Sequence, residues 1–413
     1  MKSRERILAA LEHRPPDRVP VDFGSNPSSG IAAPAYNKLK KHLALAGGPA
    51  RIYDVMQQLA QPEDEILDMF GVDVVDVGRV SPAAGDHWYD VRLPDGGAGQ
   101  YPGWFKPIRR TDGTLEVEVE GIAIMRMPPG GLSFDQIYFP YLDGYPATFA
   151  DLRGALRKVL RGESILNRGP QADTPNFWHR LRAEVLRLRA GSDRAFMIGC
   201  DGSLFEWGVC LRRQDNFLMD MLTEQKKVEA LLDALTEIHL ADLEKVCAAL
   251  GDCVDLVRFS DDLGMTAGPM MSPPIYRKLF KPRQAVLNDY IHKNTGMKTF
   301  LHSCGSIYAL LPDLIEAGFD IINPVQTNCA DMEPRRLKEE FGSEITFWGG
   351  GCDSMKILNH GSVAQVKRHV FERLEIFTPG GGYVFSTVHH ILPETPPRNI
   401  RAIFEAVAEF NRK

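Results

Sequence analysis

Short runs of β-branched and other apolar residues recur along the chain, and longer segments with apolar residues three or four positions apart separate most of them. The short runs have the length of buried strands, and the longer segments have the period of amphipathic helices. Such alternation predicts parallel βαβ units. Eight runs fit a strand: residues 18–24, 72–78, 194–202, 255–264, 297–305, 320–326, 344–353 and 382–390. Eight strands favour an α/β fold closed into a (β/α)₈ TIM barrel, and a doubly wound open sheet is the alternative.

Helical spacing is longest over residues 215–250 and 272–296. The second of these segments begins with serine and prolines and ends near a glycine, as helices commonly do. At the N-terminus, Ile7, Leu8 and Leu11 form one face of a short helix. This segment is charged and has no continuous apolar core, so it is not expected to be a signal peptide.

Residues 85–145 break the alternation, because they are rich in glycine, proline and aromatic side chains. Within them, residues 113–121 alternate between apolar and charged positions like an exposed hairpin strand. We therefore expect an insertion or lid in the βα loop after the second strand. The whole chain, residues 1–413, is expected to form a single barrel domain around it.

The composition argues against some classes of protein. The chain is 44% hydrophobic and 25% charged, with a net charge of −6, which is typical of a globular protein and argues against nucleic acid as the main partner. No run approaches the 18 apolar residues of a membrane span. Seven cysteines in a long chain predict free thiols in a reducing cytoplasm, together with one possible metal site.

Polar residues follow the later strands at the end where a barrel carries its active site. If the strands close into a barrel, these residues meet at one mouth although they span some 130 positions. They are Ser260, Asp261 and Asp262 after the fourth strand, His302, Ser303 and Cys304 after the fifth, Asn323 and Gln326 after the sixth, Cys352 and Asp353 after the seventh, and His389 and His390 after the eighth.

His302 and Cys304 are one residue apart, so on an extended segment they face the same way. Thiolate and imidazole together favour zinc over magnesium or calcium. Cys352 and His389, alone or together, could complete the ligand set. The pattern is short, however, and a buried cysteine is often only a small apolar residue.

The segments around these residues resemble the uroporphyrinogen decarboxylase superfamily, and most closely its zinc- and corrinoid-dependent methyltransferase branch. The resemblance covers nearly the whole chain and is most specific over residues 255–408. It implies a (β/α)₈ barrel. The decarboxylases proper carry an arginine-containing segment near the N-terminus that binds tetrapyrrole carboxylates, and the corresponding residues 22–31 here contain no arginine.

The methyltransferase branch also implies a ligand set. Its H-x-C motif matches His302 and Cys304, and its third ligand, a cysteine, falls on His389. Cys352 could supply the missing thiolate from the neighbouring strand. The resemblance therefore implies Zn²⁺ held by His302 and Cys304, with His389 and Cys352 as the further candidates.

The resemblance implies an enzyme that moves a methyl group between a small methylated substrate or thiol and a corrinoid (cobalamin), with O-demethylation of a methoxylated compound as one option. The chain has no D-x-H-x-x-G signature of cobalamin binding, so we expect a partner protein to carry the corrinoid. Asp261 and Asp262 are the expected catalytic carboxylates. The residues expected to contact substrate are Glu206, Asn323, Gln326 and His390.

Two alternatives remain. One is a metal-free decarboxylase of a porphyrinogen-like substrate, against which the absent arginine argues. The other is a non-catalytic accessory protein that binds a corrinoid. The sequence identifies neither the methyl donor nor the oligomeric state.

Overall fold

The computed structural model describes residues 1–81, 87–159, 176–200 and 202–412. Its main sheet is parallel, with seven strands in the order β18-β17-β16-β15-β12-β11-β4. These strands are β4 (Val74–Asp76), β11 (Ala195–Gly199), β12 (Leu256–Ser260), β15 (Lys298–His302), β16 (Ile321–Asn323), β17 (Thr346–Trp348) and β18 (Tyr383–Val384). Each falls within one of the predicted runs.

The first predicted strand closes the sheet. The backbone N–H of Asp22 donates to the Phe385 carbonyl (2.8 Å), and that of Phe385 donates to Pro20 (2.9 Å). On the other side, the N–H of Asp73 donates to the Val21 carbonyl at 2.8 Å. Residues 20–22 therefore bridge β18 and the start of β4, and the predicted (β/α)₈ barrel is confirmed.

Alternate side chains of the strands fill the barrel interior. One buried cluster contains Phe300 and Trp348, whose rings meet edge to face, together with apolar residues of the other strands. The N-terminal helix α1 (Ser3–Leu11) closes this cluster with Ile7 and Leu11, as the predicted apolar face requires. Burial of these side chains removes apolar surface from water on both faces of the sheet, which is why its strands are almost continuously apolar.

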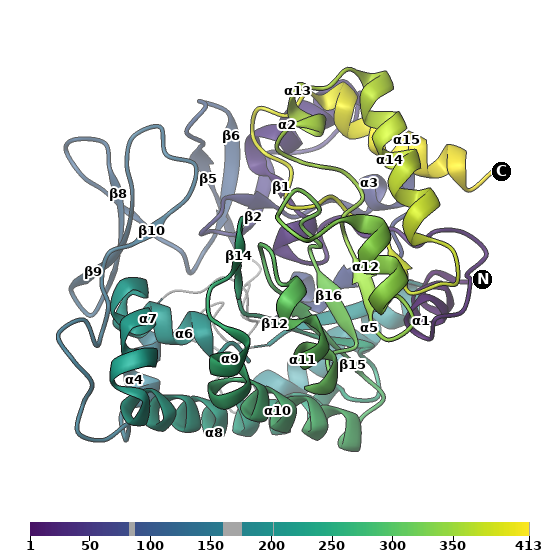
Figure 1. The fold of residues 1–413 in the computed structure, drawn as a ribbon. Helices are drawn as coiled ribbons and strands as arrows, with labels where there is room; N and C mark the ends of the chain where they lie inside the picture. Colours follow the sequence, from purple (N-terminus) through teal and green to yellow (C-terminus); the bar gives the residue numbers. More distant parts are fainter. Residues whose placement is uncertain (82–86, 160–175, 201, 413) are drawn as a thin grey trace.

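Helices follow most of the strands and pack on the outside of the barrel (Figure 1). They are α2 (Ala33–His42), α3 (Asp64–Met69), α4 (Leu152–Arg157), α5 (Phe177–Gly191), α6 (Phe205–Arg212), α7 (Gln214–Thr223), α8 (Gln225–Leu250), α9 (Pro273–Leu279), α10 (Lys281–Asn294), α11 (Leu311–Glu316), α12 (Pro334–Phe341), α13 (Ile357–His360), α14 (Val363–Phe377) and α15 (Pro397–Phe410). Within the described ranges, none has the combination of length and apolar character needed to cross a membrane.

The two long helical predictions are each divided in two. The segment 215–250 is interrupted at Glu224, between α7 and α8. The segment 272–296 is interrupted at Phe280, just before Pro282 at the start of α10. Proline has no N–H to donate and restricts the residue before it, so the second break has a local cause.

Between β4 and β11 the chain forms short antiparallel strands on one side of the molecule (Figure 1). They are β5 (Trp88–Arg92), β6 (Ala98–Pro102), β7 (Ile108–Arg109), β8 (Leu115–Val119), β9 (Ile122–Met127) and β10 (Asp135–Gln136). β8 pairs with β9 where a hairpin strand was expected. β5 and β6 extend the sheet of β1 (Ile31–Ala32), β2 (Ala50–Asp54) and β3 (Leu59–Ala60). Residues 85 and 86 of the predicted insertion lie outside the described residues, and the single-domain organisation and lid role remain predictions.

A buried ion pair joins α1 to the start of β4, and its contribution to stability can be measured. Asp73 is fully buried and accepts from Arg6 (2.6 Å) and Arg18 (2.8 Å). Asp73→Ala leaves the buried Arg6 without this partner, so we expect unfolding in denaturant to require about 3–5 kcal/mol less free energy. Asp193→Ala is the control, because its pair with Lys2 is exposed and its loss should have little effect on stability. Equal effects of the two changes would contradict this account.

Candidate metal centre

Three potential ligands meet at the C-terminal ends of β15 and β18. His302 is the last residue of β15, Cys304 follows it in the next loop, and His389 lies after β18. One ligand atom from each lies within 4.8 Å of the other two. The Cys304 Sγ is 3.4 Å from His302 Nε2. The structure thus brings together the two residues of the H-x-C motif and one of the two further candidates.

Hydrogen bonds on the far side of His302 set its orientation. Its Nδ1 lies 2.7 Å from the Asn323 Oδ1, while the Asn323 Nδ2 donates to the Trp348 carbonyl at 2.9 Å. Because that carbonyl can only accept, the Asn323 oxygen must face His302, which then carries its proton on Nδ1. Nε2 is left with a lone pair on the side of Cys304, the arrangement that a metal-binding histidine needs.

The two histidines after β18 are held in the neutral form. Burial, followed by repulsion from His390 and His302, lowers the pKa of His389 well below its usual value. Burial, followed by repulsion from His302, lowers the pKa of His390 to about 4. Neutral imidazole is the metal-binding form, so His389 is in a suitable state. His390 lies beside it, with ring centroids 4.6 Å apart, and its contact with substrate remains a prediction.

Neighbouring loops hold the backbone of the Cys304 loop in place. The Cys304 N–H donates to Asp262 Oδ1 at 2.8 Å, and the Gly305 N–H donates to Gln326 Oε1. Gly305 has φ +85°, and a Cβ there would lie 2.3 Å from the backbone carbon of Gly264. Only glycine tolerates both this conformation and this close approach. Gln326, expected to contact substrate, therefore supports the loop.

The family of the chain can now be stated. The family model described as uroporphyrinogen decarboxylase (URO-D) matches residues 184–410, more than half of the chain. The chain belongs to the uroporphyrinogen decarboxylase family. The resemblance inferred from its motifs is thus confirmed.

The relatives of this chain include proteins named as methyltransferases and proteins named as decarboxylases. Methylcobamide:CoM methyltransferase MtaA of Methanosarcina barkeri is 24% identical over 236 residues, which cover 55% of this chain and 62% of that protein, less than two thirds of its length. A uroporphyrinogen decarboxylase of Anaeromyxobacter sp. (strain Fw109-5) is 27% identical over 342 residues, 76% of this chain and 92% of that protein. The solved structure of a methyltransferase from Methanosarcina mazei, 20% identical, covers 99% of both chains with a TM-score of 0.60, which supports the fold.

In this family member the two neighbouring aspartates have different surroundings. Asp261 is fully buried and accepts backbone N–H groups of Leu204, Phe205 and Glu206 at 2.9–3.2 Å, where α6 begins. Asp262 has a side chain 36% exposed, with Oδ1 3.6 Å from His302 Nε2. Asp261 therefore caps α6, whereas Asp262 lies beside the ligand group, and a catalytic role for either residue remains a prediction.

Other predicted residues are also placed by their contacts. Asn323 is fully buried and orients His302, and its contact with substrate remains a prediction. Glu206 is half-buried and accepts from the Ser260 hydroxyl at 3.0 Å, at the end of β12. It remains a candidate for substrate contact.

The structure does not bring Cys352 into the ligand group. Its thiol is fully buried, and burial, followed by repulsion from Asp353, raises its pKa far above the usual value. A thiol in such surroundings stays protonated and behaves as a small apolar group. Its position after β17 predicted a ligand, but strand-end position alone does not say which way a side chain points.

Residues 22–28, which follow the first strand, were missed as part of the site. Asp22, Asn26 and Ser28 are buried and connect to Asn323 and Trp348 by hydrogen bonds. Their signal was present, because they are polar residues after a barrel strand, as at the other strand ends. Small, turn-forming residues are also typical of ordinary loops, so the sequence did not distinguish this segment from one.

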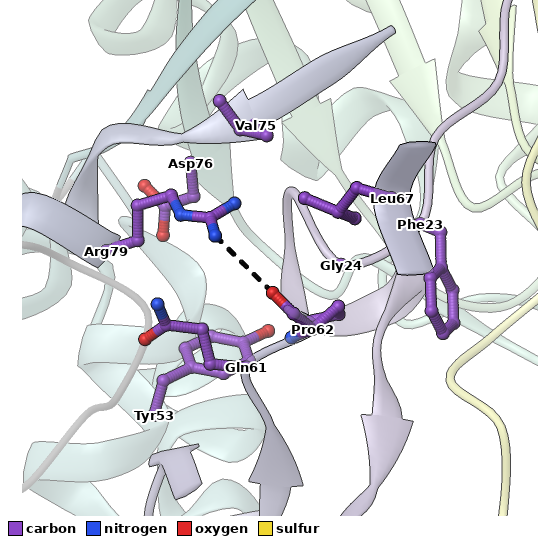
Figure 2. A pocket seen from close by; sticks show the side chains of 9 residues that line it. All are labelled: Phe23, Gly24, Tyr53, Gln61, Pro62, Leu67, Val75, Asp76 and Arg79. Atoms are coloured by element: carbon purple, nitrogen blue, oxygen red, sulfur yellow. Dashed lines mark hydrogen bonds between the residues drawn. The ribbon is translucent and has the colours of Figure 1, made fainter. Parts of the chain in front are cut away.

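A separate small cavity lies near the end of β4 (Figure 2). Arg79 lies across it and donates to the Pro62 carbonyl at 3.4 Å, and it pairs with Asp64 at 3.0 Å. The cavity has about 20 Å³ of free space, enough for about one water molecule. None of the three ligand residues lines it, so it is not a substrate pocket for this centre.

The different roles of the two aspartates give a stability prediction. Asp261→Ala leaves three backbone N–H groups without their acceptor, so the free energy of unfolding should fall by about 2 kcal/mol or more. Asp262→Ala removes one such bond at a half-exposed position and should cost about 1 kcal/mol or less. Denaturant unfolding of both variants measures this difference, and a larger loss for Asp262→Ala would refute the assignment.

Proposed function

We propose that this protein is a zinc-dependent methyltransferase that moves a methyl group between a small methylated substrate or thiol and a corrinoid carried by a partner protein. The observation that carries this proposal is the approach of His302, Cys304 and His389 to within 4.8 Å at the barrel mouth. The relative named as a methylcobamide:CoM methyltransferase supports the reaction class.

The donor set fits zinc. Two imidazoles and one thiol are ligand types that Zn²⁺ prefers, and three protein ligands with an open position are usual in catalytic zinc sites. Zinc held here would supply a Lewis acid that lowers the pKa of a bound thiol or stabilises an alkoxide leaving group. A methoxylated compound is one donor that this chemistry could serve, by O-demethylation.

The residues around the ligands would transfer protons and orient the substrate. Asp262 combines partial exposure with a carboxylate 3.6 Å from His302 Nε2, so it can accept or return a proton at a substrate atom near the centre. Glu206 and His390 are candidates to contact substrate.

The residues after the first strand favour this proposal over a metal-free decarboxylase. Among residues 22–31, which contain no arginine, the side chains of Asp22, Asn26 and Ser28 are at most 2% exposed. They bond to one another and to residues under the metal centre, so they are not available to bind the carboxylates of a tetrapyrrole. Turnover with a methylated donor and a reduced corrinoid protein would exclude a purely non-catalytic accessory role.

The metal content of the purified protein is the first test. We expect about one zinc per chain, measured by elemental analysis after incubation with zinc and dialysis. The double variant His302→Ala with Cys304→Ser should lose most of it, and His389→Ala should bind zinc more weakly. Full occupancy of the double variant would contradict the proposal.

Cobalt substitution tests which thiol binds. Co²⁺ bound to a thiolate gives a charge-transfer absorption band whose intensity rises with the number of thiolates. We expect a band for one thiolate, which Cys304→Ser abolishes. Cys352→Ser, the matched control, should leave it unchanged, because the Cys352 thiol is buried and is not part of the ligand group. A weaker band in Cys352→Ser would restore that residue as a ligand.

Asp262 should matter for turnover more than for metal binding. Asp262→Asn keeps the shape of the side chain but removes its ability to accept a proton. A decrease in kcat of about 10²-fold or more, with unchanged zinc content, is expected. An equal loss of zinc and activity would indicate that Asp262 only supports the site.

A further inference from the structure

A chain of buried polar side chains leads away from the metal centre to the first barrel strand. Ser28 Oγ lies 2.6 Å from Asn323 Oδ1 and 2.6 Å from Asn26 Oδ1. The Asn26 amide lies 2.9 Å from Asp22 Oδ2, which also accepts from the Trp348 indole N–H at 2.8 Å. The carboxyl group of Asp22 is thus connected to His302 through three side chains.

The end of this chain nearest the metal centre has only one consistent orientation. The Trp348 carbonyl accepts the Asn323 N–H, so the Asn323 oxygen faces both His302 and Ser28. This oxygen has two lone pairs and can accept from both. It cannot donate to either.

The single hydrogen of the Ser28 hydroxyl then determines how the Asn26 amide is oriented. This hydroxyl has one hydrogen but lies 2.6 Å from two amide oxygens. If that hydrogen is donated to Asn26, the contact with Asn323 becomes two bare oxygens at 2.6 Å, which repel each other. If it is donated to Asn323, Asn26 must present its NH₂ group to Ser28.

The two ends of a side-chain amide have nearly the same shape, so hydrogen bonding decides its orientation. With its NH₂ group toward Ser28, Asn26 turns its oxygen toward Asp22 Oδ2, and that contact requires a hydrogen on the carboxyl group. The Ser29 N–H, which lies 3.3 Å from the Asn26 side-chain oxygen, is not left without an acceptor, because it also donates to the Asn26 backbone carbonyl at 3.2 Å.

We propose that Asp22 is held as a neutral carboxylic acid and that its hydrogen-bond chain, together with the Trp348 carbonyl, holds His302 in the tautomer with the proton on Nδ1. Asp22 is then a positioning residue, since it acts on the ligand through Asn26, Ser28 and Asn323. The groups that bond to it are the Trp348 indole, the Asn26 amide, the Ser25 backbone N–H and the side chains of Ser25 and Ser29, and all of them are neutral.

Burial supports this protonation state. Asp22 is 2% exposed, and removal of its carboxyl group from water raises its pKa, partly offset by hydrogen bonds from Trp348, Ser25 and Ser29. Loss of hydration penalises the charged form of a carboxyl group that has no cation beside it.

The tautomer can be measured in metal-free protein. With ¹⁵N-labelled histidine, long-range ¹H–¹⁵N correlation spectra distinguish Nδ1–H from Nε2–H, and His302→Gln identifies the signal. We expect Nδ1–H in the wild type and a larger Nε2–H fraction in Ser28→Ala, in which the Trp348 carbonyl alone orients Asn323. Thr346→Val, which removes a buried hydroxyl outside this chain, should leave the spectrum unchanged. Nε2–H in the wild type, or no change in Ser28→Ala, would overturn the proposal.

The acid itself can be seen by infrared spectroscopy. At neutral pH, ¹³C-labelled aspartate should shift a carbonyl band of a protonated carboxyl group in the wild type, and Asp22→Asn should lack that band. If the only difference between wild type and Asp22→Asn lies in the ionised carboxylate bands, Asp22 is charged and the proposal is wrong.

A consequence for metal affinity rests on the proposed function. Loss of a hydrogen bond behind a ligating histidine commonly weakens metal binding by about 10–100-fold, so Ser28→Ala should weaken zinc binding in a chelator competition, whereas Thr346→Val should not. Wild-type affinity for Ser28→Ala would overturn the positioning role. If the wild type binds no zinc, the proposed function fails, while the NMR and infrared results still decide the tautomer and the state of Asp22.

Discussion

The register between β15 and β16 places His302 beside Asn323, and the arrangement of the candidate centre depends on this pairing. Asn323 is fixed by the Trp348 carbonyl on the next strand, so three adjacent parallel strands determine where one imidazole points. A shift of one residue in this register would turn His302 away from the barrel interior. The orientation of the ligand is therefore a property of the sheet.

Hydrogen bonds inside the protein also decide which residues at the strand ends are structural and which could meet a substrate. The hydrogen bonds of Asp261 are used to begin α6, and those of Gln326 are used to hold the Cys304 loop. Asp262 retains a half-exposed carboxylate next to the ligands. A side chain whose polar atoms are already bonded inside the protein contributes to rigidity, whereas one with an exposed atom can meet a substrate.

The ligand set also has a consequence for charge. One thiolate and two neutral imidazoles would leave a bound divalent zinc with a net charge of +1, whereas a second cysteine in place of His389 would neutralise it. A more positive centre stabilises an anionic leaving group more strongly, and it makes a bound thiolate a weaker nucleophile. If the proposed centre holds zinc, a histidine at position 389 would therefore suit stabilisation of an anionic leaving group better than activation of a thiolate.

The sequence by itself determined the architecture of the barrel and the H-x-C pair. Buried parallel strands need continuous apolar runs, and an extended segment places His302 and Cys304 on one face, so both features are local. The break at Phe280 had a local signal as well, in Pro282. Only the tertiary structure chose His389 over Cys352, separated Asp261 from Asp262, and joined Asp22 to His302. These outcomes depend on which way side chains turn once eight strands close and on which buried donors find acceptors, and residues distant in sequence decide both.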